Sequence, residues 1–259
     1  MADKNRVERL LASMTLEEKL GQLNMIDAGA PPMGREELDR QIKAGKVGGL
    51  LNTWGAEDIT TFQKLAAESR LQIPVLFGLD VLHGHRTIFP LPIAEACAFD
   101  PALWERTARA AADETIRDGI TLTFAPMLDV CRDPRWGRIA EGPGEDPLVT
   151  SRYAEAKVRG FQGTDLRDGV AATAKHMGAY GAVAAGRDYG SADISERQLA
   201  EVYLPPFEAA VKAGVAAIMP SFNDVAGVPA TAHGAMLNDL LREKWGFDGI
   251  VVSDYTAVV

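Results

Sequence analysis

Short apolar runs rich in β-branched residues alternate with amphipathic stretches along the whole chain, and this alternation constrains the fold more than any other feature. Apolar runs of this length, bounded by turn residues, are typical of buried parallel strands, and the stretches between them have the periodicity of helices. The pattern predicts seven strands, at 21–26, 47–52, 74–80, 122–129, 171–175, 216–222 and 249–254. It predicts helices at 36–43, 57–69, 101–118, 147–160, 195–213 and 234–245.

Polar and charged residues recur where the predicted strands end, which favours an α/β (β/α)8 barrel of the TIM type over an open doubly wound sheet. No linker composition or internal repeat divides the chain, so we expect one domain over residues 1–259. An eighth strand and helix are not found, and we expect a barrel that stops after its seventh strand. Unpaired edges on the first and seventh strands would then favour association with a second copy or with another segment.

Charge and hydropathy exclude several classes of function. The 27 Lys and Arg residues against 36 Asp and Glu give a net charge of −9 without a basic run, which argues against nucleic-acid binding. No apolar run approaches the roughly 20 residues of a membrane span, and the charged N-terminus is not a signal peptide. The sequence fits either a periplasmic protein whose signal peptide has been removed or a cytoplasmic protein. We interpret Cys97 and Cys131 as buried thiols.

Several polar side chains follow apolar strands directly and are candidates for chemistry. Asp80 ends the third predicted strand, and it suits either a sugar hydroxyl or a cap of the next helix. Lys175 and His176 end the fifth, where a solvated charged face would be unusual. Asp254 ends the seventh, and its position supports catalysis and loop capping equally. No metal site is expected, because no third ligand accompanies His83 and His85.

The loop after the fourth predicted strand is dense in Arg, Asp, Glu and Gly and is unsuited to a core. Arg138 can form a two-pronged contact with sugar hydroxyls or with a carboxylate. The alternative is that the loop arginines pair with the loop carboxylates and hold the loop together, and we expect this of at least two of the three. The arginines are Arg132, Arg135 and Arg138, and the carboxylates are Asp133, Glu141 and Glu145.

Taken together, these segments resemble the N-terminal barrel domain of glycoside hydrolase family 3, in its β-glucosidase branch. The resemblance covers nearly the whole chain, and its motifs occur in the family's order. The matching segments are Met14-Thr-Leu-Glu-Glu-Lys-Leu-Gly-Gln-Leu23, Asp80-Val-Leu-His-Gly84, Cys131-Arg-Asp-Pro-Arg-Trp-Gly-Arg138, Glu145-Asp-Pro147, Lys175-His176, Gly186-Arg-Asp-Tyr189 and Gly246-Phe-Asp-Gly-Ile-Val-Val-Ser-Asp254.

The resemblance implies a role for each matching site residue. It implies that Asp254 is the nucleophile of a retaining mechanism with a covalent glycosyl-aspartate intermediate and no cofactor. The residues that it assigns to the hydroxyls of the sugar are Asp80, Arg138, Lys175 and His176. The resemblance also implies that Phe222 and Tyr255 belong to the same substrate site, and Phe222 stands where many relatives have Tyr.

The second carboxylic acid of a retaining glycosidase lies roughly 5–5.5 Å from the nucleophile. In the β-glucosidase branch, a following α/β domain carries this acid/base residue, which would therefore lie beyond Val259. A related N-acetylhexosaminidase branch uses a His after Lys-His-Phe-Pro-Gly-His, but this chain reads Lys175-His-Met-Gly-Ala-Tyr180.

The resemblance predicts an enzyme that releases terminal non-reducing β-D-glucosyl residues from small β-glucosides or oligosaccharides. Two alternatives stay open. One is a sugar-binding fragment without activity of its own, and the other is a β-xylosidase, arabinosidase or phosphorylase on the same scaffold.

Overall fold

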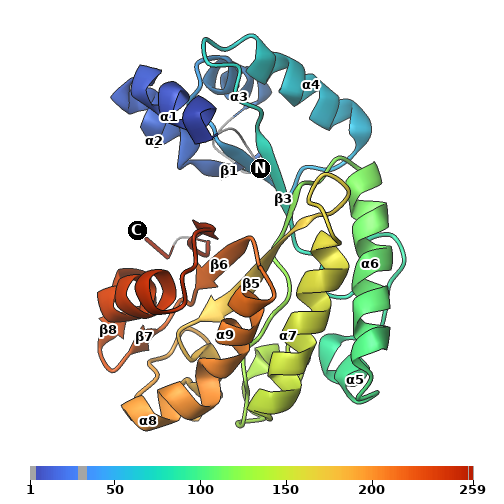
Figure 1. Ribbon diagram of the computed structural model, residues 1–259, viewed down its shortest axis with the longest axis vertical. Helices are drawn as coiled ribbons and strands as arrows, with labels where there is room; N and C mark the ends of the chain where they lie inside the picture. Colours follow the sequence, from blue (N-terminus) through green and yellow to red (C-terminus); the bar gives the residue numbers. More distant parts are fainter. Residues whose placement is uncertain (1–3, 29–33, 256, 259) are drawn as a thin grey trace. The chain divides into compact units, whose positions relative to one another are not determined.

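The computed structural model describes residues 4–28, 34–255 and 257–258, and these fold into two compact units. Unit 1 comprises the described residues up to Asp80 together with Thr115–Leu122, and unit 2 comprises Val81–Glu114 and those from Thr123 onward. Figure 1 shows the course of the chain through both. Among the described helices, none has the length and apolarity needed to cross a bilayer.

Unit 1 contains three parallel strands hydrogen-bonded in chain order, with Ile26 opposite Leu50 and Leu50 opposite Phe77. Its strands are β1 (Met25–Asp27), β2 (Gly49–Leu51) and β3 (Leu76–Leu79). Its helices are α1 (Lys4–Ser13), α2 (Leu16–Gln22), α3 (Arg35–Lys43) and α4 (Ala56–Ala67). Each strand lies within or overlaps a predicted run.

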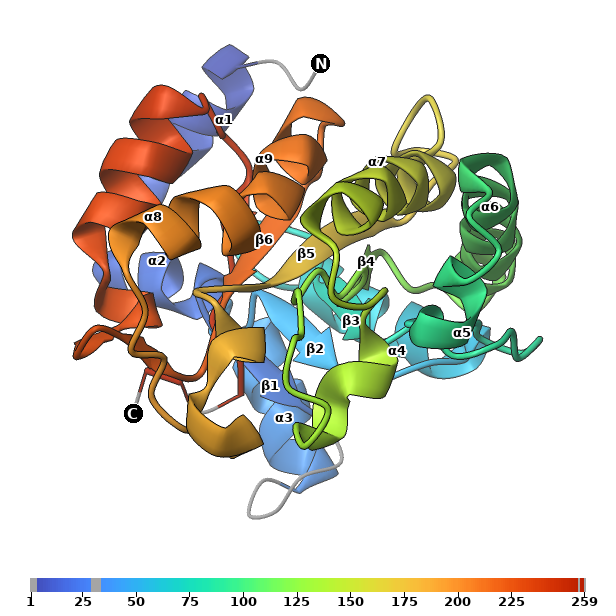
Figure 2. The ribbon, with the colours of Figure 1, turned by 90° about the horizontal axis from the view of Figure 1, so that it is seen from below.

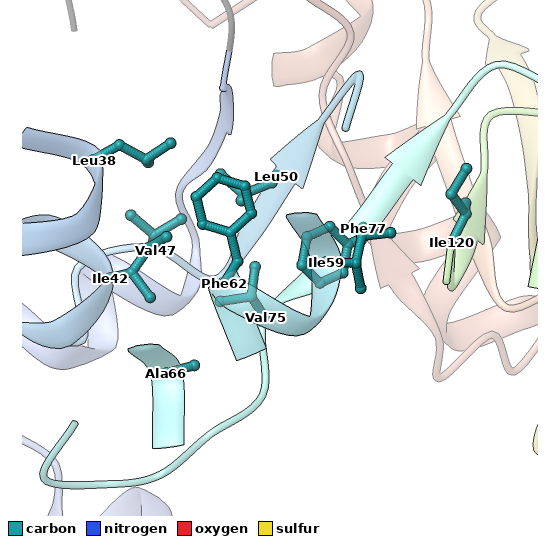
Figure 3. Packing of buried hydrophobic residues seen from close by; sticks show 10 residues of the cluster. All are labelled: Leu38, Ile42, Val47, Leu50, Ile59, Phe62, Ala66, Val75, Phe77 and Ile120. Carbon is teal, nitrogen blue, oxygen red and sulfur yellow. The ribbon is translucent and has the colours of Figure 1, made fainter. Parts of the chain in front are cut away.

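The core of unit 1 forms where α3 and α4 pack on the strands (Figure 3). Ile42 of α3 and Phe62 of α4 are buried against Leu50 of β2 and Phe77 of β3. The backbone at Gly119 packs closely against the Ile59 side chain, since an added Cβ would lie 2.9 Å from its atoms. Gly119 also has a φ of +83°, which favours glycine. The buried faces of the helices thus follow the apolar periodicity of the sequence.

A capping box begins α2. The Thr15 hydroxyl accepts from the Glu18 N–H at 3.2 Å, and the Glu18 carboxylate accepts from the Thr15 N–H at 2.9 Å. Arg70 adds a second partner for this carboxylate, with Nε 2.9 Å from Glu18 Oε1. Because α2 extends to Gln22, the first strand begins at Met25 and not at the predicted Gly21.

Unit 2 contains the parallel strands β5, β6 and β9, again in chain order, with Ile218 opposite Val251. The bounds are Ala171–Met177 for β5, Ala217–Pro220 for β6 and Ile250–Val251 for β9. The α-helices are α5 (Pro92–Ala96), α6 (Pro101–Arg117, whose last turn lies in unit 1), α7 (Pro147–Gln162), α8 (Glu196–Gln198) and α9 (Pro205–Lys212). A hairpin of β7 (Asp224–Val225) and β8 (Val228–Pro229) was not predicted.

Helix α7 lies between α6 and α9 on the outside of β5 and β6 (Figures 1 and 2). The approach to α6 is close at Gly160, where an added Cβ would lie 2.4 Å from the carbonyl oxygen of Glu105. Pro101 and Pro147 begin α6 and α7, in the first turn where a missing N–H costs nothing.

Prolines explain two departures from the predicted elements. The predicted helix at 195–213 is divided into α8, the π-helical segment η4 (Leu199–Tyr203) and α9, because Pro205 and Pro206 cannot donate backbone hydrogen bonds. The Ser195 hydroxyl caps the start of α8, accepting from the Gln198 N–H. The predicted strand at 122–129 is regular only as β4 (Leu122–Thr123), and Pro126 interrupts its continuation.

The predicted burial of the cysteines is right for Cys131 and wrong for Cys97. Cys97 is the residue at which the short helix α5 ends, and its Sγ donates to the Ile93 carbonyl oxygen on an exposed face.

The predicted helix at 234–245 is present as the π-helical segment η6 (Ala235–Lys244).

Candidate active site

The Asp254 carboxylate lies just after β9, at the carboxyl end of the parallel strands of unit 2. The Val252 N–H donates to the Ile218 carbonyl oxygen at 3.0 Å, which extends the strand pairing almost to Asp254. The Asp254 side chain is 16% exposed, and its Oδ2 lies 3.1 Å from His176 Nε2. Its Oδ1 accepts from the Tyr255 N–H at 2.7 Å. The nucleophile candidate is thus largely enclosed but still reachable from solvent.

The His176 imidazole lies between two carboxylates. It extends from β5, is fully buried, and has Nδ1 2.7 Å from Asp129 Oδ2. The same Asp129 oxygen accepts from the His176 backbone N–H at 3.0 Å. The Leu128 N–H donates to the Lys175 carbonyl oxygen at 2.6 Å, and this bond sets Asp129 beside His176. The Lys175–His176 peptide bond is cis.

The Arg138 guanidinium makes a two-pronged ion pair with Glu141 and also reaches His176. Arg138 belongs to the 3-10 helix η1 (Gly137–Glu141), with Nε 2.7 Å from Glu141 Oε1 and a terminal nitrogen 2.9 Å from Oε2. That terminal nitrogen lies 3.3 Å from His176 Nε2. Arg138 therefore holds the loop and contributes to the site as well.

The other two loop arginines have structural contacts. Arg135 pairs with Asp133 at 2.6 Å on the surface, and Arg132 donates to the backbone carbonyl of Glu145. Of the three arginines, Arg135 pairs only with a loop carboxylate, Arg138 pairs with Glu141 and also reaches His176, and Arg132 contacts a backbone carbonyl.

An aromatic cluster forms one wall of the site in unit 2. The ring of Tyr180 packs edge-on to His176 at 5.3 Å between centroids, and Phe222 lies 6.2 Å from His176. Asp188 accepts from the Tyr180 hydroxyl at 2.5 Å and from the Trp136 indole N–H at 3.0 Å. Phe222 thus contributes an apolar face beside the charged groups.

Burial and neighbouring cations act in opposite directions on the acids of this site. Burial has the largest effect on Asp254 and raises its pKa, but the hydrogen bond and charge of His176, with smaller effects of the Tyr255 N–H and Lys175, leave that pKa below its ordinary value. The pKa of Glu141 is likewise lowered, because Arg138, Lys175 and His176 outweigh burial. Asp254 is therefore ionised near neutral pH.

Unit 2 contains all but one of the predicted site residues. Lys175 is buried in β5 and engaged in polar interactions, and Tyr255 has an exposed ring. Asp80 lies in unit 1, directly after β3, exposed and engaged in polar interactions. Within the described ranges, no three His, Cys, Asp or Glu side chains are grouped as metal ligands.

Sequence reasoning missed the roles of Asp129, Tyr180 and Asp188. Asp129 could have been found, since it ends the fourth predicted strand just as Asp80 and Asp254 end theirs. Tyr180 and Asp188 lie in loops, and only the fold shows that they meet.

Unit 2 is an α/β unit in which an ionised carboxylate follows a parallel strand, with His, Arg and Lys side chains nearby. Such an arrangement is suited to binding a polar ligand. The chain belongs to glycosyl hydrolase family 3: the pattern of the family's N terminal domain matches residues 15–259.

Relatives and solved structures agree with this assignment. The chain is 43% identical to the periplasmic beta-glucosidase of Salmonella typhimurium over 255 residues, which cover 97% of this chain and 33% of that protein. It is 42% identical to a beta-xylosidase of Formosa agariphila over 207 residues, 74% of this chain and 29% of that protein.

The structural match is equally extensive. The crystal structure of beta-glucosidase from Listeria innocua in complex with isofagomine superposes with a TM-score of 0.91 at 36% identity, covering 98% of this chain and 37% of that chain. The predicted α/β barrel class is confirmed. The chain spans about a third of the length of these relatives.

Proposed function

We propose that this chain carries the nucleophile and the sugar site of a retaining exo-β-glycosidase that removes terminal non-reducing β-D-glucosyl residues. The observation that carries the proposal is the Asp254 carboxylate at a strand end, ionised, partly accessible, and 3.1 Å from His176. The beta-glucosidases among the relatives support glucose as the sugar.

In the first step, an Asp254 oxygen attacks the anomeric carbon while the bond from that carbon to the aglycone oxygen breaks. The aglycone leaves with a proton from a general acid, and a glycosyl ester with Asp254 remains. The residue that acted as general acid then deprotonates a water molecule, which attacks the ester. β-Glucose is released and Asp254 is regenerated. Positive charge develops on the sugar in both transition states, and the Asp254 carboxylate stabilises it.

The remaining predicted residues would bind the hydroxyls of the sugar. Lys175 and Arg138 are donors to hydroxyl oxygens, whereas Asp80, in unit 1, is an acceptor. The half-buried Phe222 would pack against an apolar face of the ring. We propose that Tyr255 lies at the rim, because this residue is 66% exposed.

We propose that the general acid lies outside the 259 residues, in a segment corresponding to the two thirds of the relatives that the chain does not match. That residues 1–259 form one domain also remains a prediction. A substrate with a very acidic leaving group, such as 2,4-dinitrophenol, needs no protonation and isolates the step at Asp254.

The test is to trap the intermediate with 2,4-dinitrophenyl 2-deoxy-2-fluoro-β-glucoside, whose fluorine slows the second step. We expect the chain to gain the mass of one fluoroglucosyl group, located by peptide mapping to Asp254. Asp254→Asn should gain none, and the exposed Asp248→Asn is the matched control that should label normally. Labelling of Asp254→Asn would contradict the nucleophile assignment. Absence of labelling in the unaltered chain would favour a sugar-binding fragment without activity of its own.

A second candidate is β-xylosidase activity, which the 42% identity to the Formosa agariphila beta-xylosidase favours. The two sugars differ by the hydroxymethyl group on C5, a difference that pocket shape sets. Comparing kcat/KM for dinitrophenyl β-glucoside and β-xyloside decides between them.

A further inference from the structure

We infer that Tyr189 forms a binding site for the aglycone, the part of the substrate that leaves, by packing its ring against an aryl group or a second pyranose. Such a site rests on the proposed function, because it extends the sugar site to the leaving group. Tyr189 ends the segment Gly186-Arg-Asp-Tyr189, and the proposed function gives this tyrosine no role.

The Tyr189 ring continues the aromatic cluster of the site towards solvent. Its centroid lies 4.9 Å from that of Phe222, with the two rings at 78°, and 6.5 Å from that of Tyr180. Phe222 in turn lies 6.2 Å from His176, which contacts Asp254. Exposure increases along this series, since His176 is fully buried, Phe222 is half-buried and Tyr189 is 65% exposed. Tyr189 is therefore the member of the cluster that a ligand reaches from solvent.

The order of the rings indicates which part of a substrate each one meets. An enzyme that removes terminal sugars encloses the terminal sugar at its nucleophile, so the aglycone is the part that extends towards solvent. Phe222, beside His176, would pack against the sugar that is cleaved, and Tyr189 against the group that leaves. A pyranose has an apolar C–H face and an aryl group has a π face, and a tyrosine ring packs against either.

The backbone of Tyr189 has a conformation that bulky residues rarely adopt. Its φ is +61°, in the left-handed region that favours glycine. Residues in such conformations cluster at ligand sites, where the surrounding structure imposes them. The Tyr189 ring is left mostly in solvent, so its packing within the chain offsets little of the strain. A ligand on the exposed ring would make use of this position.

Contacts beside Tyr189 hold the loop that carries it. Asp188 accepts from the hydroxyl of the buried Tyr180 and from the indole N–H of the buried Trp136. The loop approaches Trp136 again at Gly186, where an added Cβ would lie 2.7 Å from the Trp136 backbone nitrogen. Tyr189 therefore extends from a fixed backbone, and a ligand that packs on its ring has little loop to order.

Three variants separate the effect of the ring from that of the backbone. Tyr189→Asn removes the ring, and because Asn adopts the left-handed conformation more readily than Tyr, the loop should keep its structure. Tyr189→Phe keeps the ring and loses only the hydroxyl. Phe99→Asn is the matched control, since Phe99 is also exposed, at 71%, and has a φ of +49°. Phe99 follows α5, and its N–H donates to the Ala96 carbonyl oxygen.

The test compares the dissociation constants of phenyl and methyl 1-thio-β-glucoside, which differ only in the aglycone and resist hydrolysis, by isothermal titration calorimetry. We expect the unaltered chain to bind the phenyl compound about 3- to 10-fold more tightly, the effect of one aromatic contact. Tyr189→Asn should bring this ratio close to 1 and leave the affinity for the methyl compound unchanged. Tyr189→Phe and Phe99→Asn should keep the ratio. The Tm of Tyr189→Asn should equal or exceed that of the unaltered chain, because the variant relieves strain.

The outcomes separate this site from the proposed function. Equal affinities of the unaltered chain for the two glucosides would overturn the inference, even where Tyr189→Asn fails to fold. A ratio that persists in Tyr189→Asn would overturn it as well. In both cases, labelling of Asp254 by the fluoroglucoside leaves the proposed function intact. Absence of binding to both glucosides overturns the inference, and absence of labelling at Asp254 then refutes the proposed function too.

Discussion

His176 Nε2 lies 3.1 Å from Asp254 Oδ2, and this contact opposes the effect of burial on the carboxylate. Burial alone would raise the pKa of Asp254 above its ordinary value. The hydrogen bond and charge of His176 lower this pKa by more, so that it lies below the ordinary value. The pair thus keeps a largely enclosed acid in its nucleophilic form.

Replacing His176 with Gln should shift the acid limb of the pH profile. Without the hydrogen bond and charge that His176 contributes, burial dominates, the pKa of Asp254 rises, and the carboxylate becomes protonated at a higher pH. We expect kcat/KM for dinitrophenyl β-glucoside to fall off at a higher pH on the acid side. His233→Gln, which alters a helix-capping contact in unit 2, should leave the profile in place. An unchanged acid limb in His176→Gln would show that His176 does not control the ionisation of Asp254.

Arg138→Lys should weaken sugar binding although the positive charge is kept. An ammonium cannot reproduce the fork of the guanidinium, whose nitrogens lie 2.7 and 2.9 Å from the two oxygens of Glu141. We expect kcat/KM to fall by about tenfold or more, mostly through a higher KM, since a hydrogen bond to a charged group contributes about 1.5–3 kcal/mol. Arg135→Lys in the same loop alters only a surface pair with Asp133 and should behave like the unaltered chain. Equal kinetics of the two variants would remove Arg138 from the sugar site.

The sequence predicted the parts of the fold and site that depend on local pattern. Asp254 and His176 follow apolar strands, and parallel strands bring their carboxyl ends to one edge, so strand pattern makes both residues candidates, while the resemblance to the family supplied their roles. Their distance depends on the register of β5, β6 and β9, which no local pattern encodes. Asp129 ends its predicted strand in the same way, but its contact with His176 depends on the pairing of Leu128 with Lys175, which the sequence does not show. The association predicted from the unpaired edges remains a prediction.

A buried ion pair between α5 and α7 should make a large contribution to the stability of unit 2. Lys157 Nζ lies 2.6 Å from Glu95 Oε2, both side chains are almost fully buried, and Tyr153 donates to the same oxygen at 2.9 Å. Lys157→Met leaves the Glu95 charge buried without its cation, which typically costs about 3–5 kcal/mol in the free energy of unfolding.

Urea unfolding measures this loss, and two variants control for it. Lys212→Met breaks an exposed pair with Glu208 and should change the free energy of unfolding by less than about 1 kcal/mol. Glu95→Gln combined with Lys157→Met removes both charges, and we expect it to be more stable than Lys157→Met alone. A loss in Lys157→Met no greater than in Lys212→Met would mean that the buried pair has no net effect.

The capping carboxylate of Glu18 should make the stability of unit 1 depend on acidity. The Arg70 hydrogen bond, followed by the Thr15 N–H, lowers the pKa of Glu18 from 4.5 to about 2. Because this pKa is lower in the folded state, the stabilisation is fully present above 4.5 and is lost as the pH falls towards 2. Glu18→Gln should therefore lower the Tm at pH 7, and the difference from the unaltered chain should shrink between pH 4.5 and 2. Glu17→Gln, the neighbouring exposed acid on α2, should show no such convergence, and a difference in Tm for Glu18→Gln that is constant across this range would contradict the assignment.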